Sequence, residues 1–235
     1  MQNTPVDRSA RPLYNPQTMR GQPNSEGAGS IERVGQCLLR MCNSVESLFA
    51  DALVAYLDGS PEMADELRTD DYRVHEQWVE IDRLCRGLLS RPAADRGRVR
   101  SLLCAVQIAG ALKRAADESQ QLGQRLRECG LAGTPPTDSL PRMIELTQTM
   151  LGDVVEALVN RDPAEASGVH LVFRELADLH RRAEGAIARG IAEGGIDAPA
   201  GAALMGVPQR LLRIGDEAVG IAGRVARFYR EAESG

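Results

Sequence analysis

Apolar side chains recur at intervals of three and four residues along most of the chain beyond its first 30 residues. The longest regular run follows Ser30 and comprises Ile31, Val34, Leu38, Met41, Val45, Leu48, Ala52 and Tyr56. This spacing is that of an α-helix that buries one face. Comparable runs predict five further helices, over residues 60–89, 95–130, 138–158, 162–192 and 197–229.

Prolines, glycines and short polar residues mark the ends of these predicted helices. Ser60-Pro61 and Asp162-Pro163 are typical of an N-cap followed by the first helical residue, and Asp138 and Asp197 are placed to cap two more helices. The segment Gly206-Val207-Pro208 lies inside the last predicted helix, where it predicts a kink or a broken start. Because the connections are short, successive helices should run antiparallel.

The chain contains an internal repeat. Four residues recur at a constant offset of 99, so that Leu112, Arg114, Asp117 and Glu118 return as Leu211, Arg213, Asp216 and Glu217. Two copies of one unit predict an all-α fold of two tandem three-helix bundles, with six long antiparallel helices in a pseudo-twofold repeat. The expected organisation is a disordered tail at 1–29, a first repeat at 30–130, a linker at 131–137 and a second repeat at 138–235.

Composition narrows the class of protein further. Aromatic residues make up only 3% of the 235 residues, which favours close packing of aliphatic helices over a β-sandwich. The net charge of −5 argues against binding to nucleic acid. Five cysteines without a CxxC pair are typical of the reducing cytoplasm. No apolar run approaches the roughly 20 residues needed to span a bilayer, so we expect no membrane insertion.

The sequence offers no recognisable catalytic motif. Glycine-rich nucleotide-binding patterns are absent, the three histidines are scattered, and no Glu-x-x-His pair of the di-iron type occurs. We therefore expect no enzyme. Two helical rows combine imidazole with carboxylate, Asp71 with His75 and His170 with Arg174 and Asp178. Each row is either a transition-metal site or simply the polar face of a helix.

The repeated segment carries a family resemblance. Leu211 to Ala222, with Arg213 and Gly215, resembles the Leu-Glu-Arg-Ile-Gly-Asp signature on the third helix of each repeat in the PhoU family. Leu112 to Asp117, with Lys113 and Arg114, resembles the first-repeat version. The resemblance covers about residues 31–232 and implies two repeated three-helix bundles.

The resemblance also implies a function. PhoU proteins are cytoplasmic regulators of phosphate uptake and phosphate homeostasis, which restrain a phosphate-starvation two-component system. They are thought to act as adaptors between a phosphate ABC transporter ATPase and a sensor histidine kinase, and these are the partners we expect. Long bundles with alanine-rich faces often self-associate, so we also expect a homodimer. The alternatives are a metal-binding helical protein and a helical scaffold that has lost the phosphate role.

Some PhoU proteins bind metal through Glu-x-x-x-Asp pairs on the third helices, helped by an Asp-x-x-Ile-Asp pattern on the second helix of each repeat. Here the signature Glu is replaced by Lys113 and Leu212. On the second helices the two copies are 102 residues apart, as Pro61 and Pro163 are, so the corresponding positions fall on Asp71 and His75 in the first repeat and on Phe173 and Ala177 in the second. The residual candidate ligands are Asp71, His75, Asp117 and Asp216.

Hard cations need several oxygen ligands, and most of them are missing from this pattern. We therefore expect no resident cofactor and at most weak binding of Fe, Mn, Zn or Mg. Lys113 and Asp117 lie four residues apart on one helix face. If Asp71 faces them, the ammonium could take the charge role of the metal. The alternative is a solvated lysine on an outer face.

Overall fold

The computed structural model describes residues 28–58, 61–90, 96–128, 138–161 and 165–233. It contains six helices and, in the described residues, no strand. They are α1 (Ala28–Asp58), α2 (Pro61–Leu89), α3 (Arg96–Glu128), α4 (Ser139–Asn160), α5 (Glu165–Ala192) and α6 (Ala198–Glu233). The predicted all-α class is confirmed. The predicted linker lies outside the described residues, as does the predicted tail except for its last two residues, which belong to α1.

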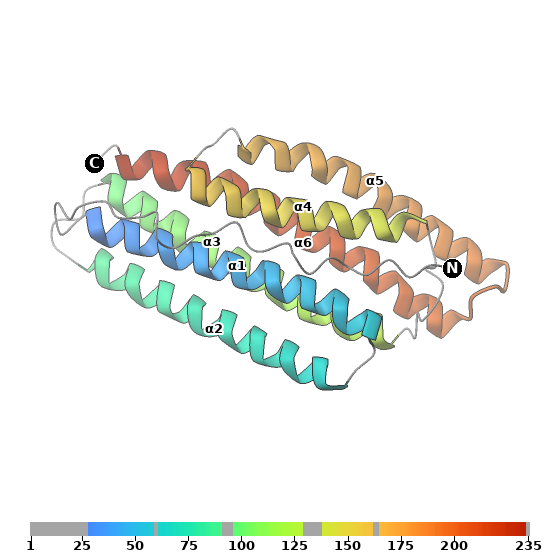
Figure 1. Ribbon diagram of the computed structural model, residues 1–235. Helices are drawn as coiled ribbons and strands as arrows, with labels where there is room; N and C mark the ends of the chain where they lie inside the picture. The colour runs from blue at the N-terminus through green and yellow to red at the C-terminus, as the bar shows by residue number, and fades with distance from the viewer. Residues whose placement is uncertain (1–27, 59–60, 91–95, 129–137, 162–164, 234–235) are drawn as a thin grey trace.

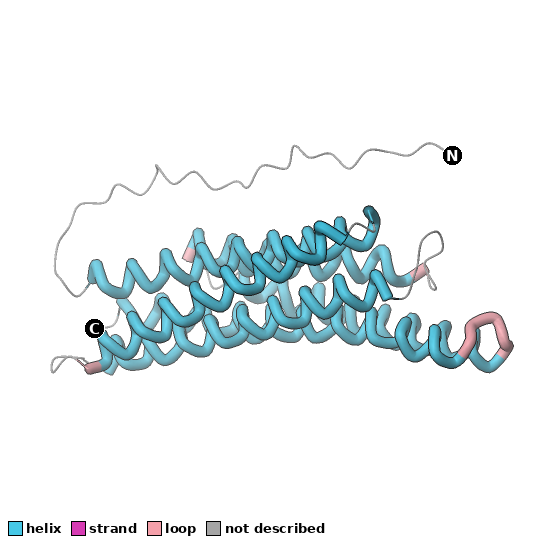
Figure 2. Tube along the Cα trace, turned by 90° about the horizontal axis from the view of Figure 1, so that it is seen from below, coloured by secondary structure: helices cyan, strands magenta, loops and turns pink. Residues whose placement is uncertain are grey.

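The helices form one elongated bundle with their axes roughly aligned (Figures 1 and 2). The most extensive helix pair is α3 with α6, and α1 also packs against α4. Helix α2 covers α1 and α3 on one flank, and α5 covers α4 and α6 on the opposite flank (Figure 1). The third helix of each half of the chain therefore lies at the centre of the molecule, where the two halves meet.

The core is one continuous aliphatic cluster to which all six helices contribute. Alanine fills much of α3, with Ala105, Ala109, Ala111, Ala115 and Ala116 all buried. Small side chains on several faces allow α3 to pack against α1, α2 and α6 at once, because helix axes approach closely only where side chains are small. The close packing of this central helix thus fits a chain that is rich in small side chains and poor in aromatic ones.

The helix boundaries that the structure describes follow the sequence signals with two corrections, and the predicted caps Ser60 and Asp162 lie outside the described residues. Asp197 accepts a hydrogen bond on Oδ1 from the Ala200 amide at 2.7 Å and caps α6, as expected. Asp138 is itself in helical conformation and makes no side-chain cap, so its predicted capping role is wrong. Of the kink or broken start predicted for α6, the broken start is also wrong, because the helix runs unbroken through Pro208.

Tertiary packing explains why Pro208 does not interrupt α6. The proline removes one backbone hydrogen bond, which in an isolated helix costs about 3 kcal/mol. Pro208 and its neighbours Leu204, Val207 and Leu211 are all buried. Burial of this apolar face holds the segment helical. No helix in the described ranges is both long enough and apolar enough to cross a membrane.

Candidate functional site

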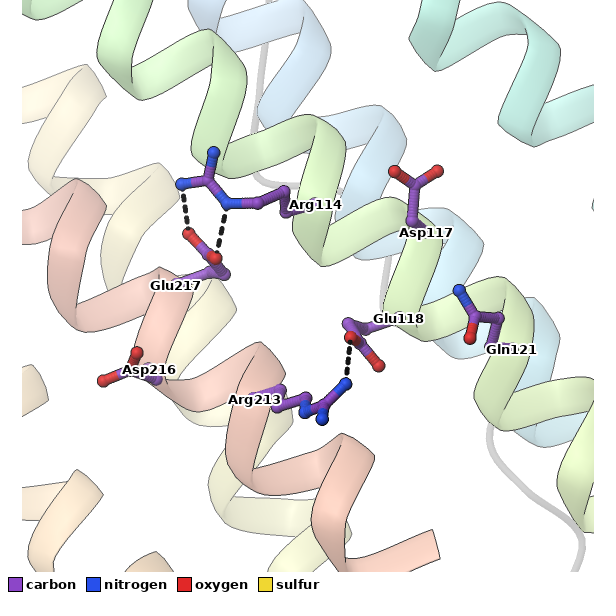
Figure 3. A pocket seen from close by; sticks show the side chains of 7 residues that line it. All are labelled: Arg114, Asp117, Glu118, Gln121, Arg213, Asp216 and Glu217. Carbon is purple, nitrogen blue, oxygen red and sulfur yellow. Dashed lines mark hydrogen bonds and ion pairs between the residues drawn. The ribbon is translucent and has the colours of Figure 1, made fainter. Parts of the chain in front are cut away.

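The two copies of the repeated segment lie side by side at the seam between α3 and α6 (Figure 3). Arg114 on α3 donates two hydrogen bonds to the Glu217 carboxylate on α6, from Nε at 2.6 Å and from Nη2 at 2.8 Å. Glu118 lies four residues after Arg114 on α3, and Arg213 lies four residues before Glu217 on α6. Arg213 Nη1 donates a hydrogen bond to Glu118 Oε1 at 3.1 Å. The two helices are therefore antiparallel here.

These ion pairs are reciprocal. Arg213 and Glu217 are the repeat equivalents of Arg114 and Glu118, so each copy of the segment offers its arginine to the glutamate of the other copy. Such mutual contact is the pattern that a twofold axis produces. The signature arginines thus join the two repeats.

The pairing continues along the seam. Seven residues before Arg114, Gln107 accepts a hydrogen bond from Arg224 Nε at 3.3 Å, and Arg224 lies seven residues after Glu217. Arg210 adds a fourth guanidinium, with Nη1 at 2.6 Å from Glu118 Oε2. Both partners of this last pair are less than one-fifth exposed, whereas the Arg114 side chain is 56% exposed. The register of α3 against α6 is therefore held most firmly around Glu118.

A cleft of about 310 Å³ opens on this seam, lined by Arg114, Asp117, Glu118, Gln121, Arg213, Asp216 and Glu217. Both glutamates are neutralised by arginines. The hydrogen bonds to Glu217 raise the pKa of Arg114 by more than burial lowers it, so this pKa lies above its ordinary value. Asp216 is exposed and makes no ion pair with any described residue. The cleft is thus lined by charges of both signs that are largely paired with one another.

Lys113 lies beside this cleft, between α2 and α3. Its Nζ donates a hydrogen bond to Asp71 Oδ1 at 2.9 Å and another to Asp117 Oδ1. The lysine side chain is 17% exposed. Burial lowers the pKa of Lys113, but the hydrogen bonds and charges of Asp117 and Asp71 outweigh it and leave the pKa above its ordinary value. The expected approach of Lys113 to Asp117, with Asp71 facing both, is present.

The four predicted metal ligands do not gather in one place. Asp71 and Asp117 meet only through Lys113. His75 is exposed and lies against Trp78, with ring centroids 5.6 Å apart. Asp216 lies across the seam on α6, pointing away from Asp117 (Figure 3). Within the described ranges, no three His, Cys, Asp or Glu side chains are grouped as a metal ion needs.

The donor set therefore does not fit a divalent cation, because an ammonium already bridges the two carboxylates that approach each other. The second helical row, on α5, is equally dispersed. Asp178 pairs with Arg181 on its own helix, and His170 and Arg174 are exposed. This row is the polar outer face of α5.

Sequence reasoning noticed Glu118 and Glu217 as repeated residues but missed their pairing with arginines of the other repeat. It missed Arg210 altogether. One signal was available: an Arg followed four residues later by a Glu, present in both copies. Two such segments that pack antiparallel about a twofold axis must place each arginine near the opposite glutamate.

Comparisons with known proteins agree with this architecture. The family model described as "PhoU domain" matches the chain twice, over residues 38–126 and 140–225. A curated relative, the "Phosphate-specific transport system accessory protein PhoU homolog" of Zymomonas mobilis subsp. mobilis, is 25% identical over 189 residues, which are 80% of each chain.

Two solved structures share the fold. The crystal structure of PhoU from Pseudomonas aeruginosa superposes with a TM-score of 0.78 at 22% identity, covering 86% of this chain and 98% of that one. The phosphate transport system regulatory protein PhoU from Streptococcus pneumoniae gives a TM-score of 0.75 at 19% identity, covering 87% and 97%. With both three-helix halves matched by the family model, the chain belongs to the PhoU family.

Proposed function

We propose that this protein is a non-enzymatic regulator of phosphate transport. The observation that carries the proposal is the match of the PhoU domain to both halves of the chain. The curated relative is named as an accessory protein of a phosphate-specific transport system and covers four-fifths of this chain. The charged groups of the α3–α6 cleft, largely paired with one another, favour a structural role for this seam over catalysis.

In the finer form of the proposal, the protein is a cytoplasmic adaptor. It binds a sensor histidine kinase and the ATPase of a phosphate ABC transporter, acts as a homodimer, and restrains the two-component response when phosphate is plentiful. The support is the family membership. An elongated bundle with separate outer helices, α2 on one flank and α5 on the other, offers room for two partners at once (Figure 1).

A deletion strain tests the regulatory role. We expect a phosphate-starvation reporter to be switched on in high phosphate when the gene is deleted, and to be silenced again by the restored wild-type chain. A reporter that is unchanged by the deletion would contradict the proposal and favour a scaffold without the phosphate role. A starvation reporter for nitrogen serves as the control, because a specific regulator leaves it unchanged.

Pull-downs with purified proteins test the adaptor role separately. The bait is the full chain, and the prey are the cytoplasmic part of the phosphate sensor kinase and the phosphate transporter ATPase. A kinase and a transporter ATPase of unrelated specificity are the matched controls. Retention of the phosphate-system proteins alone supports the adaptor role. Retention of both sets to the same extent, or of neither set, contradicts it. Light scattering of the same sample should give twice the monomer mass.

A further inference from the structure

Lys113 occupies the position at which the PhoU signature has a glutamate, and it is the single lysine of the chain. Every other cationic side chain is an arginine or a histidine. An ammonium is a compact point charge that can hydrogen-bond in several directions, whereas a guanidinium is a planar fork. Between two carboxylates from different helices, the lysine ammonium is the side chain that most resembles a small cation.

The surroundings of Lys113 satisfy it from both sides. Nζ bonds Asp71 on α2 and Asp117 on α3, and the lysine is largely buried between the helices. Without this positive charge the two carboxylates would face each other across the α2–α3 interface. Neighbouring carboxylates repel each other, and the repulsion is relieved by a cation between them. Lys113 supplies this cation as a side chain of the protein itself.

From this geometry we infer that Lys113 is a built-in replacement for a divalent metal ion, so that the first repeat holds its α2–α3 carboxylate pair together without metal. The inference goes beyond the proposed function and does not depend on it. It assigns a role to a residue that departs from the family signature.

The second repeat has lost the same site in a different way. Leu212 stands at the position of Lys113, is half-buried and packs against the core. Phe173 on α5, at the position equivalent to Asp71, also packs against the core. Of the carboxylates in the metal-binding pattern, only Asp216 remains in the second repeat, and it is exposed on the seam. Apolar contact has therefore replaced charge in the second repeat, and neither repeat requires a metal.

The direct test is Mn²⁺ binding by equilibrium dialysis of the full chain and of Lys113→Glu. The substitution replaces the ammonium with a third carboxylate facing Asp71 and Asp117, and we expect Lys113→Glu to bind Mn²⁺ at least tenfold more tightly than the wild type. The matched control is Leu212→Glu, at the equivalent position of the second repeat. It gains little, because α5 offers Phe173 in place of an aspartate. A gain of less than tenfold in Lys113→Glu would overturn the inference.

A second variant measures the same role through stability. Lys113→Gln removes the positive charge and leaves a slightly shorter, neutral polar side chain, so Asp71 and Asp117 should repel each other and the melting temperature should fall. Added Mn²⁺ should restore part of the loss in Lys113→Gln but none in Lys113→Gln with Asp71→Asn, where the repulsion is gone. The wild-type melting temperature should not change with Mn²⁺ or EDTA. A wild-type chain that is stabilised by Mn²⁺, with the effect abolished by Asp71→Asn, would refute the inference.

Discussion

Burial makes two thiols of this protein poor nucleophiles. Cys42 is 2% exposed and Cys85 is not exposed at all. Burial raises the pKa of Cys42, and burial with the nearby Asp82 and Cys37 raises that of Cys85 to about 12. Because the thiolate is the reactive form, both should be nearly inert at neutral pH.

The test uses a chain in which Cys37, Cys104 and Cys129 are replaced by alanine. With Ellman's reagent at pH 8, we expect Cys42 and Cys85 to react more than about 100-fold more slowly in the folded chain than in urea. Free cysteine in the same two buffers is the control for the reagent. Reaction of the folded chain at the rate of the unfolded one would show that these positions are open to solvent.

Two glycines of α6 allow a matched comparison at the residue scale. A Cβ added to Gly215 would lie 2.5 Å from Leu176 Cδ2 and 3.3 Å from Phe173 Cδ2, whereas one added to Gly223 would meet nothing within 4 Å. Leu176 is fully buried, so it has little room to move. The signature glycine therefore allows α5 to approach α6 closely.

We expect Gly215→Ala to lower the free energy of unfolding by about 1–3 kcal/mol, as overpacking does. Gly223→Ala should raise it by about 0.5–1 kcal/mol, because alanine is the better helix former and space is available. Urea denaturation of both variants checks the contrast. Equal effects of the two substitutions would mean that the contact with Leu176 does not limit this position.

At the scale of elements, the α3–α6 register depends unequally on its two reciprocal ion pairs. Glu118 contacts Arg210, which is 16% exposed, as well as Arg213. Arg210 Nε is buried and has no hydrogen-bond partner among the residues that the structure describes, so this guanidinium depends on Glu118 for compensation of its charge. The repeat-equivalent Glu217 meets only the exposed Arg114 among the described residues.

Glu118→Gln should therefore cost about 1–3 kcal/mol of unfolding free energy, because it leaves a mostly buried arginine without its counter-ion. Glu217→Gln should cost no more than about 1 kcal/mol, as is usual for exposed pairs, and the loss should shrink in high salt. Urea denaturation at low and high ionic strength measures both. A larger cost for Glu217→Gln would reverse this order of importance.

For the whole molecule, the shared core predicts that the two repeats unfold together. The apolar cluster is continuous across all six helices, and α3 with α6 is the most extensive helix pair. Trp78, the single tryptophan, lies on α2 and reports on the first repeat alone. Its fluorescence and the far-UV circular dichroism should follow the same urea transition.

The variant Gly215→Ala, which acts in the second repeat, sharpens this test of cooperativity. It should move the Trp78 transition to lower urea by as much as it moves the circular dichroism. A Trp78 transition that stays in place while the dichroism shifts would show that the repeats unfold independently.

Local information in the sequence was sufficient to predict the helices and the repeat. Apolar periodicity, the Asp197 cap and the 99-residue offset depend on residues close together or on identity between copies. The approach of Lys113 to Asp117 was also within reach, since residues four apart share a helix face. The broken start expected at Pro208 failed because propensity ignores the burial that holds the helix together.

Only the tertiary structure decided which distant residues meet. Asp71 reaches Lys113 from another helix, and Glu217 reaches Arg114 from the other repeat. These contacts depend on the rotation and register of whole helices, which the packing of alanine-rich faces sets and helical periodicity alone leaves open. The sequence by itself determined six amphipathic helices in two copies. Packing decided that their charged signatures pair with each other across the seam, and that an ammonium joins the carboxylates of the first repeat.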